Sequence, residues 1–207
     1  MTGIGVPLLI AVYVACELIA NITAGRPVDL YGLQAPGGVF IYALTFTLID
    51  LINERLGKYR ARQVIVGAFA ANGLLALYSA FVLWLPAPSF FGYREAFAAV
   101  LGATPRIIAA SLLAYLVSSW IDVEIFAVWK ARIGGAKWLR VLSSNAVSTA
   151  IDSILFVTVA FAGTLPLPPL ITGQYVIKMA VTLISLPLIY AARFINVSGE
   201  ASESSPT

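Results

Sequence analysis

The stretch GVPLLIAVYVACELIANI, which spans residues 5–22, is apolar except for Glu17 and Asn21 near its end. A helix of this length nearly crosses the roughly 30 Å hydrocarbon core of a bilayer, because each residue adds about 1.5 Å. A secretory signal would begin with a cationic segment, and residues 1–3 supply none. The stretch therefore predicts a membrane-spanning helix that carries two polar side chains.

Five further stretches share this character, with proline and glycine at the joins between them. We therefore predict an all-α integral membrane protein with six transmembrane helices. The helices are expected at residues 5–22, 36–53, 63–85, 105–129, 143–163 and 170–194. Together they form one transmembrane domain over residues 1–197, followed by a polar tail at residues 198–207 that we expect to be disordered.

The composition supports this class and excludes several others. Of the 207 residues, 60% are hydrophobic and 11% are charged, whereas an average soluble domain has roughly 25% charged residues. The chain has no histidine and a single cysteine, Cys16, which excludes an intrachain disulfide and removes the usual ligands of metal centres. The net charge of +3 is too small and too dispersed to indicate a nucleic acid partner.

Recognisable catalytic motifs are missing from the sequence as well. It contains neither G-x-S-x-G nor H-E-x-x-H, and Asp122 and Asp152 lack the flanking residues expected of an intramembrane aspartyl protease. We therefore expect no catalytic residues, no metal site and no cofactor, and we predict that the protein is not an enzyme.

The cations indicate how the chain lies in the membrane. Nine Lys and Arg residues fall on one side of the predicted helices and three on the other. The first group is Arg55, Lys58, Arg60, Arg62, Lys130, Arg132, Lys137, Arg140 and Arg193, and the second is Arg26, Arg94 and Arg106. Because the more cationic side faces the cytoplasm, both termini are predicted to be cytoplasmic.

Ionisable and amide side chains lie inside the predicted helices. They are Glu17, Asp50, Asp122, Glu124, Asp152 and Lys178, with the amides Asn21, Asn145 and Gln174. Each costs several kcal/mol at membrane depth unless it is paired or faces a cavity, so each is a functional candidate. Counting about 1.5 Å per residue places Glu17, Asp152 and Lys178 near the bilayer midplane.

Helical spacing gathers several of these groups onto shared faces. Tyr13, Glu17 and Asn21 recur every four residues, and Gln174 and Lys178 are one turn apart. Polar faces of this kind on apolar helices line a cavity or form a buried polar seam.

A structural interpretation of the same residues remains open. Lys178 would then pair with Glu17 or Asp152 only to fix helix register, while Asp50 and Asp122 would cap or anchor helices beside the basic joins. The aromatic candidates would be packing residues or interface anchors; they are Tyr13, Phe46 and Trp120.

An internal repeat connects the fourth and fifth predicted helices. The segment VSSWIDVEIF at residues 117–126 matches VSTAIDSILF at residues 147–156, and each copy has a hydroxyl three residues before its aspartate. A fainter copy, TLID, stands at residues 47–50. These related faces are expected to line one cavity. Since helices two and five are equivalent in a three-plus-three division, the pattern also suggests an inverted repeat, with chance similarity among apolar helices as the alternative.

The chain resembles the queuosine precursor transporter family, also called the vitamin uptake transporter family. The resemblance covers nearly everything from the first predicted helix to the sixth. The residues that carry it are Ala20-Asn21-Ile22, PGGVF at 36–40, Asp50, Gly57, Ala61-Arg62, Arg106-Ile107, Ala110-Ser111, Ile121-Asp122-Val123, Phe126, Asp152-Ser153, Ala160-Phe161, Gln174-Tyr175 and Lys178.

This resemblance implies uptake across the bacterial inner membrane of 7-cyano-7-deazaguanine, 7-aminomethyl-7-deazaguanine or queuine, by alternating access. These compounds feed synthesis of the queuosine base in transfer RNA. The partners it implies are the small-molecule 7-deazaguanine and the lipid bilayer, with a homodimer left open. The alternative is a vitamin-binding membrane subunit that depends on an external ATPase module.

A 7-deazaguanine presents N–H donors and a carbonyl acceptor on one edge of a flat ring. Carboxylates would accept from the donors, amides or Lys would donate to the carbonyl, and aromatic rings would stack on the face. The candidate substrate-binding residues are therefore Glu17, Asn21, Asp50, Asp122, Asp152, Gln174 and Lys178, with the aromatic residues Tyr13, Phe46, Trp120 and Tyr175.

Overall fold

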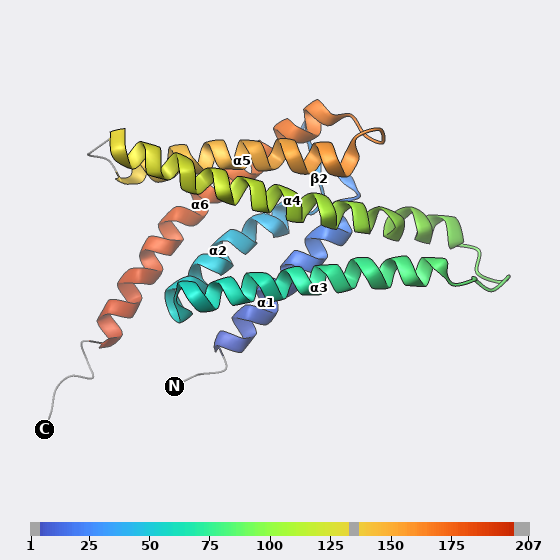
Figure 1. The fold of residues 1–207 in the computed structure, drawn as a ribbon, viewed down its shortest axis with the longest axis horizontal. Coiled ribbons are helices and arrows are strands. Elements are labelled where there is room, and N and C mark those ends of the chain that lie inside the picture. Colours follow the sequence, from blue (N-terminus) through green and yellow to red (C-terminus); the bar gives the residue numbers. More distant parts are fainter. Residues whose placement is uncertain (1–4, 133–136, 201–207) are drawn as a thin grey trace, which may run out of the picture.

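The computed structural model describes residues 5–132 and 137–200, with the side chains of residues 50, 54, 58, 122–132, 137–144 and 185–200 left aside. Figure 1 shows the described elements in chain order. They are α1 (Gly5–Thr23), β1 (Pro27–Leu30), β2 (Leu33–Pro36), α2 (Val39–Leu56), α3 (Lys58–Trp84), α4 (Arg94–Arg132), α5 (Lys137–Phe161) and α6 (Leu167–Glu200).

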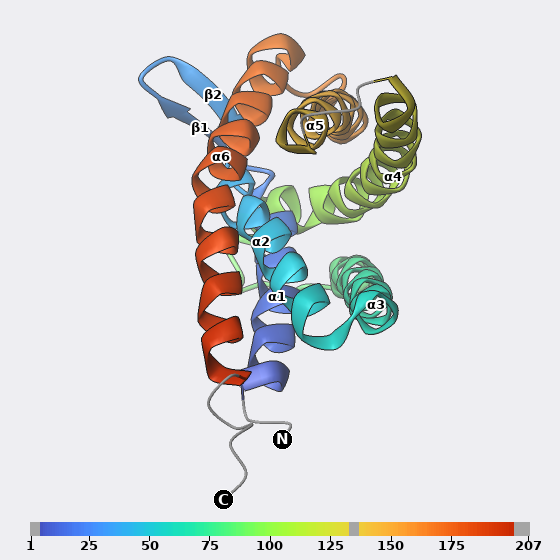
Figure 2. The same cartoon turned by 90° about the vertical axis from the view of Figure 1, so that its left-hand side faces the viewer.

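Four helical segments are long and apolar enough to cross a membrane, namely Gly5–Thr23, Tyr59–Trp84, Arg94–Ile121 and Leu167–Ile184. The apolar segments Val39–Asn53 and Asn145–Phe161 are shorter. The predicted class is therefore confirmed at the level of a multi-pass helical membrane protein. The start of α1 and the end of α6 lie toward the same end of the molecule (Figures 1 and 2).

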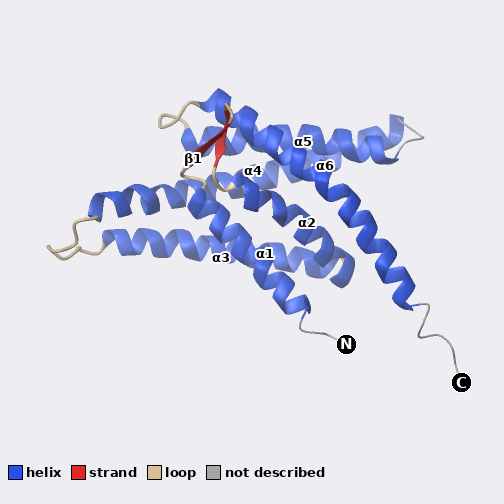
Figure 3. Ribbon diagram, turned by 180° about the vertical axis from the view of Figure 1, so that it is seen from behind, coloured by secondary structure: helices blue, strands red, loops and turns tan. Residues whose placement is uncertain are grey.

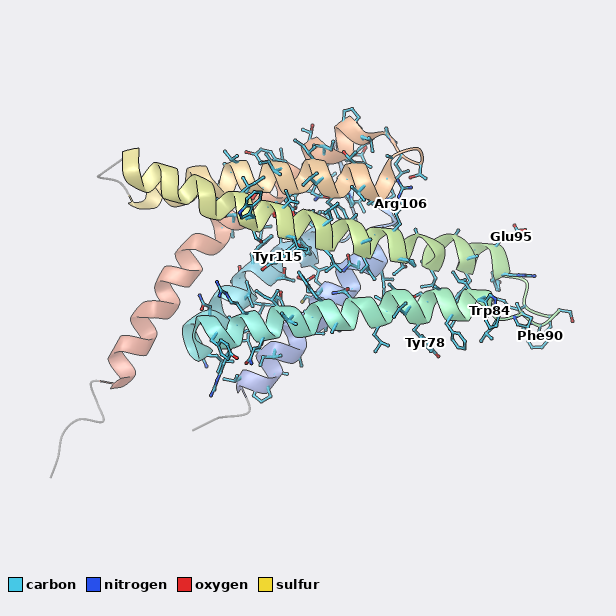
Figure 4. The ribbon with its side chains drawn as sticks, viewed as in Figure 1. Tyr78, Trp84, Phe90, Glu95, Arg106 and Tyr115 are labelled. Atoms are coloured by element: carbon cyan, nitrogen blue, oxygen red, sulfur yellow. The ribbon has the colours of Figure 1, made fainter. Side chains whose placement is uncertain are left out.

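The side chains are distributed as a bilayer requires, with apolar groups outside and polar groups inside. On α3, Leu74, Leu77 and Tyr78 are all more than 60% exposed. Figure 4 shows Tyr78, Trp84 and Phe90 on the outside of the molecule near the connection between α3 and α4. Exposed aromatic residues of this kind are typical of the membrane–water interface.

Helix α4 is longer than the sequence predicted. The sequence predicted its start near Pro105, but α4 begins at Arg94 and continues through Pro105. Proline removes only one backbone hydrogen bond from the helix. Ending the helix there would leave further backbone N–H and C=O groups unpaired, because an apolar environment offers no water to bind them. Of the predicted disordered tail, residues 198–200 belong to the last turn of α6, and residues 201–207 lie outside the described part of the chain.

Arg106 has a structural role that the count of cations did not predict. Its Nε donates to the carbonyl oxygen of Val159 at 2.7 Å, and its Nη2 donates to that of Ala162 at 2.8 Å. Both carbonyls lie at the C-terminal end of α5, where backbone acceptors lack helical partners and a positive charge is favourable. Arg106 thus joins α4 to the end of α5, as its position in Figure 4 shows.

A short β-hairpin fills the first connection, where the sequence predicted only a join. Strands β1 and β2 pair antiparallel from Pro27↔Pro36 to Leu30↔Leu33 (Figure 3). The two-residue turn places Tyr31 at φ 55° and Gly32 at φ 90°, the positive values that such tight turns require. The Asp29 carboxylate supports the turn by accepting a hydrogen bond from the Gly32 N–H at 2.7 Å.

Two glycines let backbone segments approach one another around this hairpin. A Cβ atom on Gly173 of α6 would clash with the Gln34 carbonyl oxygen of β2, and one on Gly38 would clash with the Ala20 carbonyl oxygen of α1. Strand β2 therefore lies directly against α6, as Figure 2 shows, and its residue Ala35 is fully buried. The start of α2 is held just as closely against the end of α1.

Replacing either glycine by alanine is expected to destabilise this end of the bundle. Because the atoms in the way belong to the backbone, Gly38→Ala and Gly173→Ala should each cost about 1–3 kcal/mol, measured as a lower Tm of the purified protein in detergent. Gly67→Ala on α3 is the matched control, since a Cβ there meets nothing within 4 Å. Its Tm should stay equal or rise, and an equal loss in all three variants would contradict the close contacts.

Candidate functional site

A buried ion pair joins α5 to α6. The Lys178 ammonium donates to Oδ2 of Asp152, and both residues are buried, at 4% and 6% relative exposure. The ammonium also lies 4.5 Å from the centroid of the Tyr42 ring and 6.0 Å from that of Phe46, both on α2. Ring faces attract cations, so α2 contributes to holding the same charge. Three helices therefore meet at Lys178.

Glu17 on α1 adds a second carboxylate to this region. Its side chain is buried and lies close enough to Lys178 and Asp152 to interact with both electrostatically. With all three groups ionised, two negative charges and one positive charge leave a formal charge of −1 inside the bundle. Neutral hydrogen-bond donors are then the partners that Glu17 requires.

Two buried amides connect α1 to α3. Asn21 Nδ2 donates to Asn72 Oδ1 at 2.8 Å, and Asn72 Nδ2 donates to the Ala68 carbonyl oxygen at 3.0 Å. The side-chain oxygen and nitrogen of Asn72 thus both have hydrogen-bond partners inside the protein. The Asn21 side chain lies at the edge of a cavity, with its carbonyl oxygen left as a further acceptor.

The first cavity lies beside the ion pair, toward the hairpin, and its volume of about 20 Å³ leaves room for roughly one water molecule. Its lining consists of Ala20, Asn21, Ala24, Pro36, Gly38, Val39, Tyr42, Ser111, Asp152, Phe156, Gln174 and Lys178. A carboxylate, an ammonium, two amides and a hydroxyl therefore converge on a pocket whose other walls are apolar or aromatic.

A second cavity of about 300 Å³ lies on the other side of the ion pair. It is lined by Tyr42, Phe46, Ile49, Tyr115, Ser118, Ser119, Asn145, Ser148, Thr149, Asp152 and Lys178. Hydroxyls from both copies of the sequence repeat, on α4 and α5, thus face the same space. Across the described side chains, no group of three His, Cys, Asp or Glu could hold a metal ion.

Several of the predicted site residues come together and others do not. Asn21, Asp152, Gln174 and Lys178 line the first cavity, whereas Glu17 is buried behind them and lines neither cavity. The side chains of Asp50 and Asp122 lie outside the described residues.

The aromatic candidates are more scattered. Phe46 lines the second cavity. Tyr13 is buried in an apolar cluster with Ile52, Ala61 and Ala68. Trp120 is 69% exposed, and neither it nor the half-buried Tyr175 lines either cavity.

Sequence reasoning missed four residues that shape the site. They are Tyr42, Asn72, Ser111 and Phe156, of which Phe156 was noted in the repeat but not as a lining residue. Asn72 had a readable signal, because it is the one amide in the middle of an otherwise apolar stretch. Tyr42 and Ser111 had none, since single tyrosines and serines are common in membrane helices.

Comparisons with known proteins agree with the family resemblance found in the sequence. A family model described as "Putative vitamin uptake transporter" matches residues 36–192 of the chain. The chain is 33% identical over 180 residues to the "Probable queuosine precursor transporter" of Bacillus subtilis (strain 168), a match that covers 84% of this chain and 78% of that protein. It is 24% identical over 142 residues to the "Queuosine precursor transporter" of Escherichia coli (strain K12), covering 69% of this chain and 62% of that protein. No solved structure matches the chain.

Removing both partners of the ion pair should cost less than the sum of removing each alone. Lys178→Met leaves the buried Asp152 and Glu17 carboxylates without this cation and should destabilise the protein by about 3–5 kcal/mol, whereas Asp152→Asn leaves Glu17 near Lys178 and should cost less. The double variant should lose clearly less than the sum of the single losses, by about 1–3 kcal/mol.

Thermal unfolding in detergent measures this coupling, and additive losses would contradict it. Ser153→Ala is the control, because the Ser153 hydroxyl is fully buried beside Asp152 and has no hydrogen-bond partner among the described residues. Its removal should leave the Tm nearly unchanged.

Proposed function

The chain belongs to the vitamin uptake transporter family, and we propose that it takes up a 7-deazaguanine precursor of queuosine across the bacterial inner membrane by alternating access. The family is one of transporters and not of enzymes. The candidate substrates are 7-cyano-7-deazaguanine, 7-aminomethyl-7-deazaguanine and queuine. The observation that carries the proposal is the first cavity, where Asn21, Asp152, Gln174 and Lys178 converge beside an aromatic ring.

The chemistry of this cavity is complementary to a 7-deazaguanine. The ring N–H and the exocyclic amine of the substrate point the same way, so one carboxylate accepts from both, and Asp152 is the carboxylate that lines the cavity. Gln174, Asn21 or Lys178 would donate to the neighbouring carbonyl. Leaving this polar edge unpaired at membrane depth would cost several kcal/mol, which accounts for the number of polar groups around a small cavity.

Aromatic side chains complete the proposed site. Tyr42 and Phe156 line the first cavity, from α2 and α5, and are therefore better placed to contact the flat face of the substrate than Tyr13, Trp120 or Tyr175. Glu17 would act through electrostatics on Lys178 rather than by direct contact, because it lines neither cavity.

In this proposal all six helices cross the membrane within one domain over residues 1–197, and both termini are cytoplasmic. The distribution of cations supports this orientation. The hairpin and Arg106 would then face the outside, and the connection between α4 and α5 would face the cytoplasm. The repeated hydroxyl–aspartate pattern in α2 and α5 supports a three-plus-three inverted arrangement.

Uptake of labelled precursor into cells tests the site. Asp152→Ala and Lys178→Ala should each lower the initial rate at least tenfold at equal membrane abundance, because each removes a group that contacts substrate and leaves its partner unpaired. Val176→Ala is the matched control on the same helix as Lys178, since Val176 is 43% exposed and faces away from the cavities. Uptake near the wild-type rate by both cavity variants would refute the site.

Reconstitution distinguishes a carrier that transports on its own from a vitamin-binding subunit that depends on an external ATPase module. The purified chain alone, in vesicles that contain no ATPase module, should accumulate or exchange labelled 7-cyano-7-deazaguanine. Uptake that appears only in cells with such a module would show instead that the chain is its vitamin-binding subunit.

A further inference from the structure

The second cavity has no part in the proposed substrate contacts, yet it borders the same ion pair. The linings of the two cavities overlap in only three of the described residues, Tyr42, Asp152 and Lys178. Side chains that belong to both linings form the wall between the two spaces. One buried charge pair and one aromatic ring therefore separate a small cavity of about 20 Å³ from a larger one of about 300 Å³.

The order of residues along the helices shows that the cavities lie one beyond the other along the bundle. On α5, Phe156 lines the first cavity and Ser148 the second, with Asp152 midway between them. On α2, Val39 lines the first cavity and Phe46 the second, on either side of Tyr42. Both helices thus pass from one cavity to the other at the level of the ion pair.

The polar lining of the second cavity comes from the sequence repeat. Ser118 and Ser119 of the first copy and Ser148 and Thr149 of the second occupy equivalent positions, and all four line the cavity. Ser118 Oγ donates to the Tyr115 carbonyl oxygen at 3.2 Å.

Ser148 repeats this arrangement, since its Oγ donates to the Asn145 carbonyl oxygen at 3.3 Å. Because each hydroxyl proton is used inside its own helix, each oxygen keeps its lone pairs for another donor. The second cavity therefore presents hydrogen-bond acceptors from two facing helices, which suits a ligand rich in N–H groups.

We propose that the second cavity is a further compartment for the transported molecule, and that Tyr42, Asp152 and Lys178 form the gate between the two compartments. The ligand is a flat heterocycle with several N–H donors. Its identity rests on the proposed function, whereas the position of the gate does not. In the proposed orientation the second compartment lies on the cytoplasmic side.

The physical reason for a gate at this point is the exchange of hydrogen bonds. Opening the pair would leave Asp152 and Lys178 unpaired at membrane depth, which is costly. A ligand that carries both donors and acceptors replaces each partner as it passes, so the barrier falls only while the ligand is present. Water alone in a narrow, partly aromatic passage makes a poorer replacement, and the pair stays closed.

Accessibility of single cysteines tests the gate without measuring transport. The one native cysteine is replaced by Cys16→Ala, and Ser111→Cys in the first cavity and Ser148→Cys in the second are prepared separately in the full chain. A charged, membrane-impermeant thiol reagent is added to inside-out or right-side-out vesicles. Ser148→Cys should react from the cytoplasmic side only, and Ser111→Cys should not react from that side. Similar rates for both from one side would overturn the gate.

Opening the gate should expose the first cavity to the cytoplasmic reagent. Asp152→Asn combined with Lys178→Gln should speed the reaction of Ser111→Cys from that side at least tenfold. Tyr42→Ala provides a second opening that leaves both charges in place, in case the charge variant does not fold. Val176→Ala is the lipid-facing control and should change nothing. If the opening variants that fold leave the reaction rate of Ser111→Cys from the cytoplasmic side unchanged, the gate is also overturned.

Protection by 7-cyano-7-deazaguanine distinguishes the two proposals. The compound should slow the reaction of both Ser111→Cys and Ser148→Cys. Slowing at Ser111→Cys alone would overturn the second compartment and leave the proposed function standing. One-sided accessibility without protection at either cysteine would leave the gate standing and overturn the proposed ligand.

Discussion

The buried pair between Asp152 and Lys178 is the constraint on which the rest of the site depends. A lone charge at membrane depth is so costly that each of these side chains must meet the other, which fixes α5 and α6 in one register. The Tyr42 ring covers the ammonium, so α2 is fixed against the same point. Lipid cannot form hydrogen bonds with the polar groups that surround the pair, so these groups face the interior of the bundle. A cavity lies on either side of the pair.

The hairpin end of the bundle is held by backbone contacts rather than by charge. Gly38 admits the Ala20 carbonyl and Gly173 admits the Gln34 carbonyl, while Arg106 satisfies two carbonyls at the end of α5. Such contacts allow little sliding, because backbone atoms cannot change rotamer as side chains do. The second cavity, among the described residues, is lined instead by hydroxyls and the ion pair, whose hydrogen-bond partners can be exchanged.

The sequence predicted the class of the protein and much of the polar cluster, since charges within apolar helices must find partners. It placed Gln174 and Lys178 on one face and named Glu17 or Asp152 as the partner of Lys178, of which the structure pairs Asp152. The shared face of Tyr13, Glu17 and Asn21 depended on fine rotation, and for Tyr13 the packing interpretation fits the structure. Residues four apart turn by about 40° on a helix, so Tyr13 lies about 80° from Asn21 and packs against Ile52 instead of the cavity. The hairpin and the length of α4 were missed because a tyrosine at positive φ and a proline inside a helix both contradict local preference.

A neutral ligand and a charged gate are compatible for one physical reason. Glu17, Asp152 and Lys178 together carry a formal charge of −1 when all are ionised, and a neutral heterocycle leaves that charge unchanged as it passes. What the ligand supplies is hydrogen bonds, with donors toward Asp152 and an acceptor toward Lys178. An anion would compete with Asp152 for the ammonium, and a hydrocarbon would leave both charges unpaired. The gate therefore selects for molecules that present donors and an acceptor on one edge, which is a property of the 7-deazaguanine ring whether its substituent is a neutral cyano group or a protonated aminomethyl group.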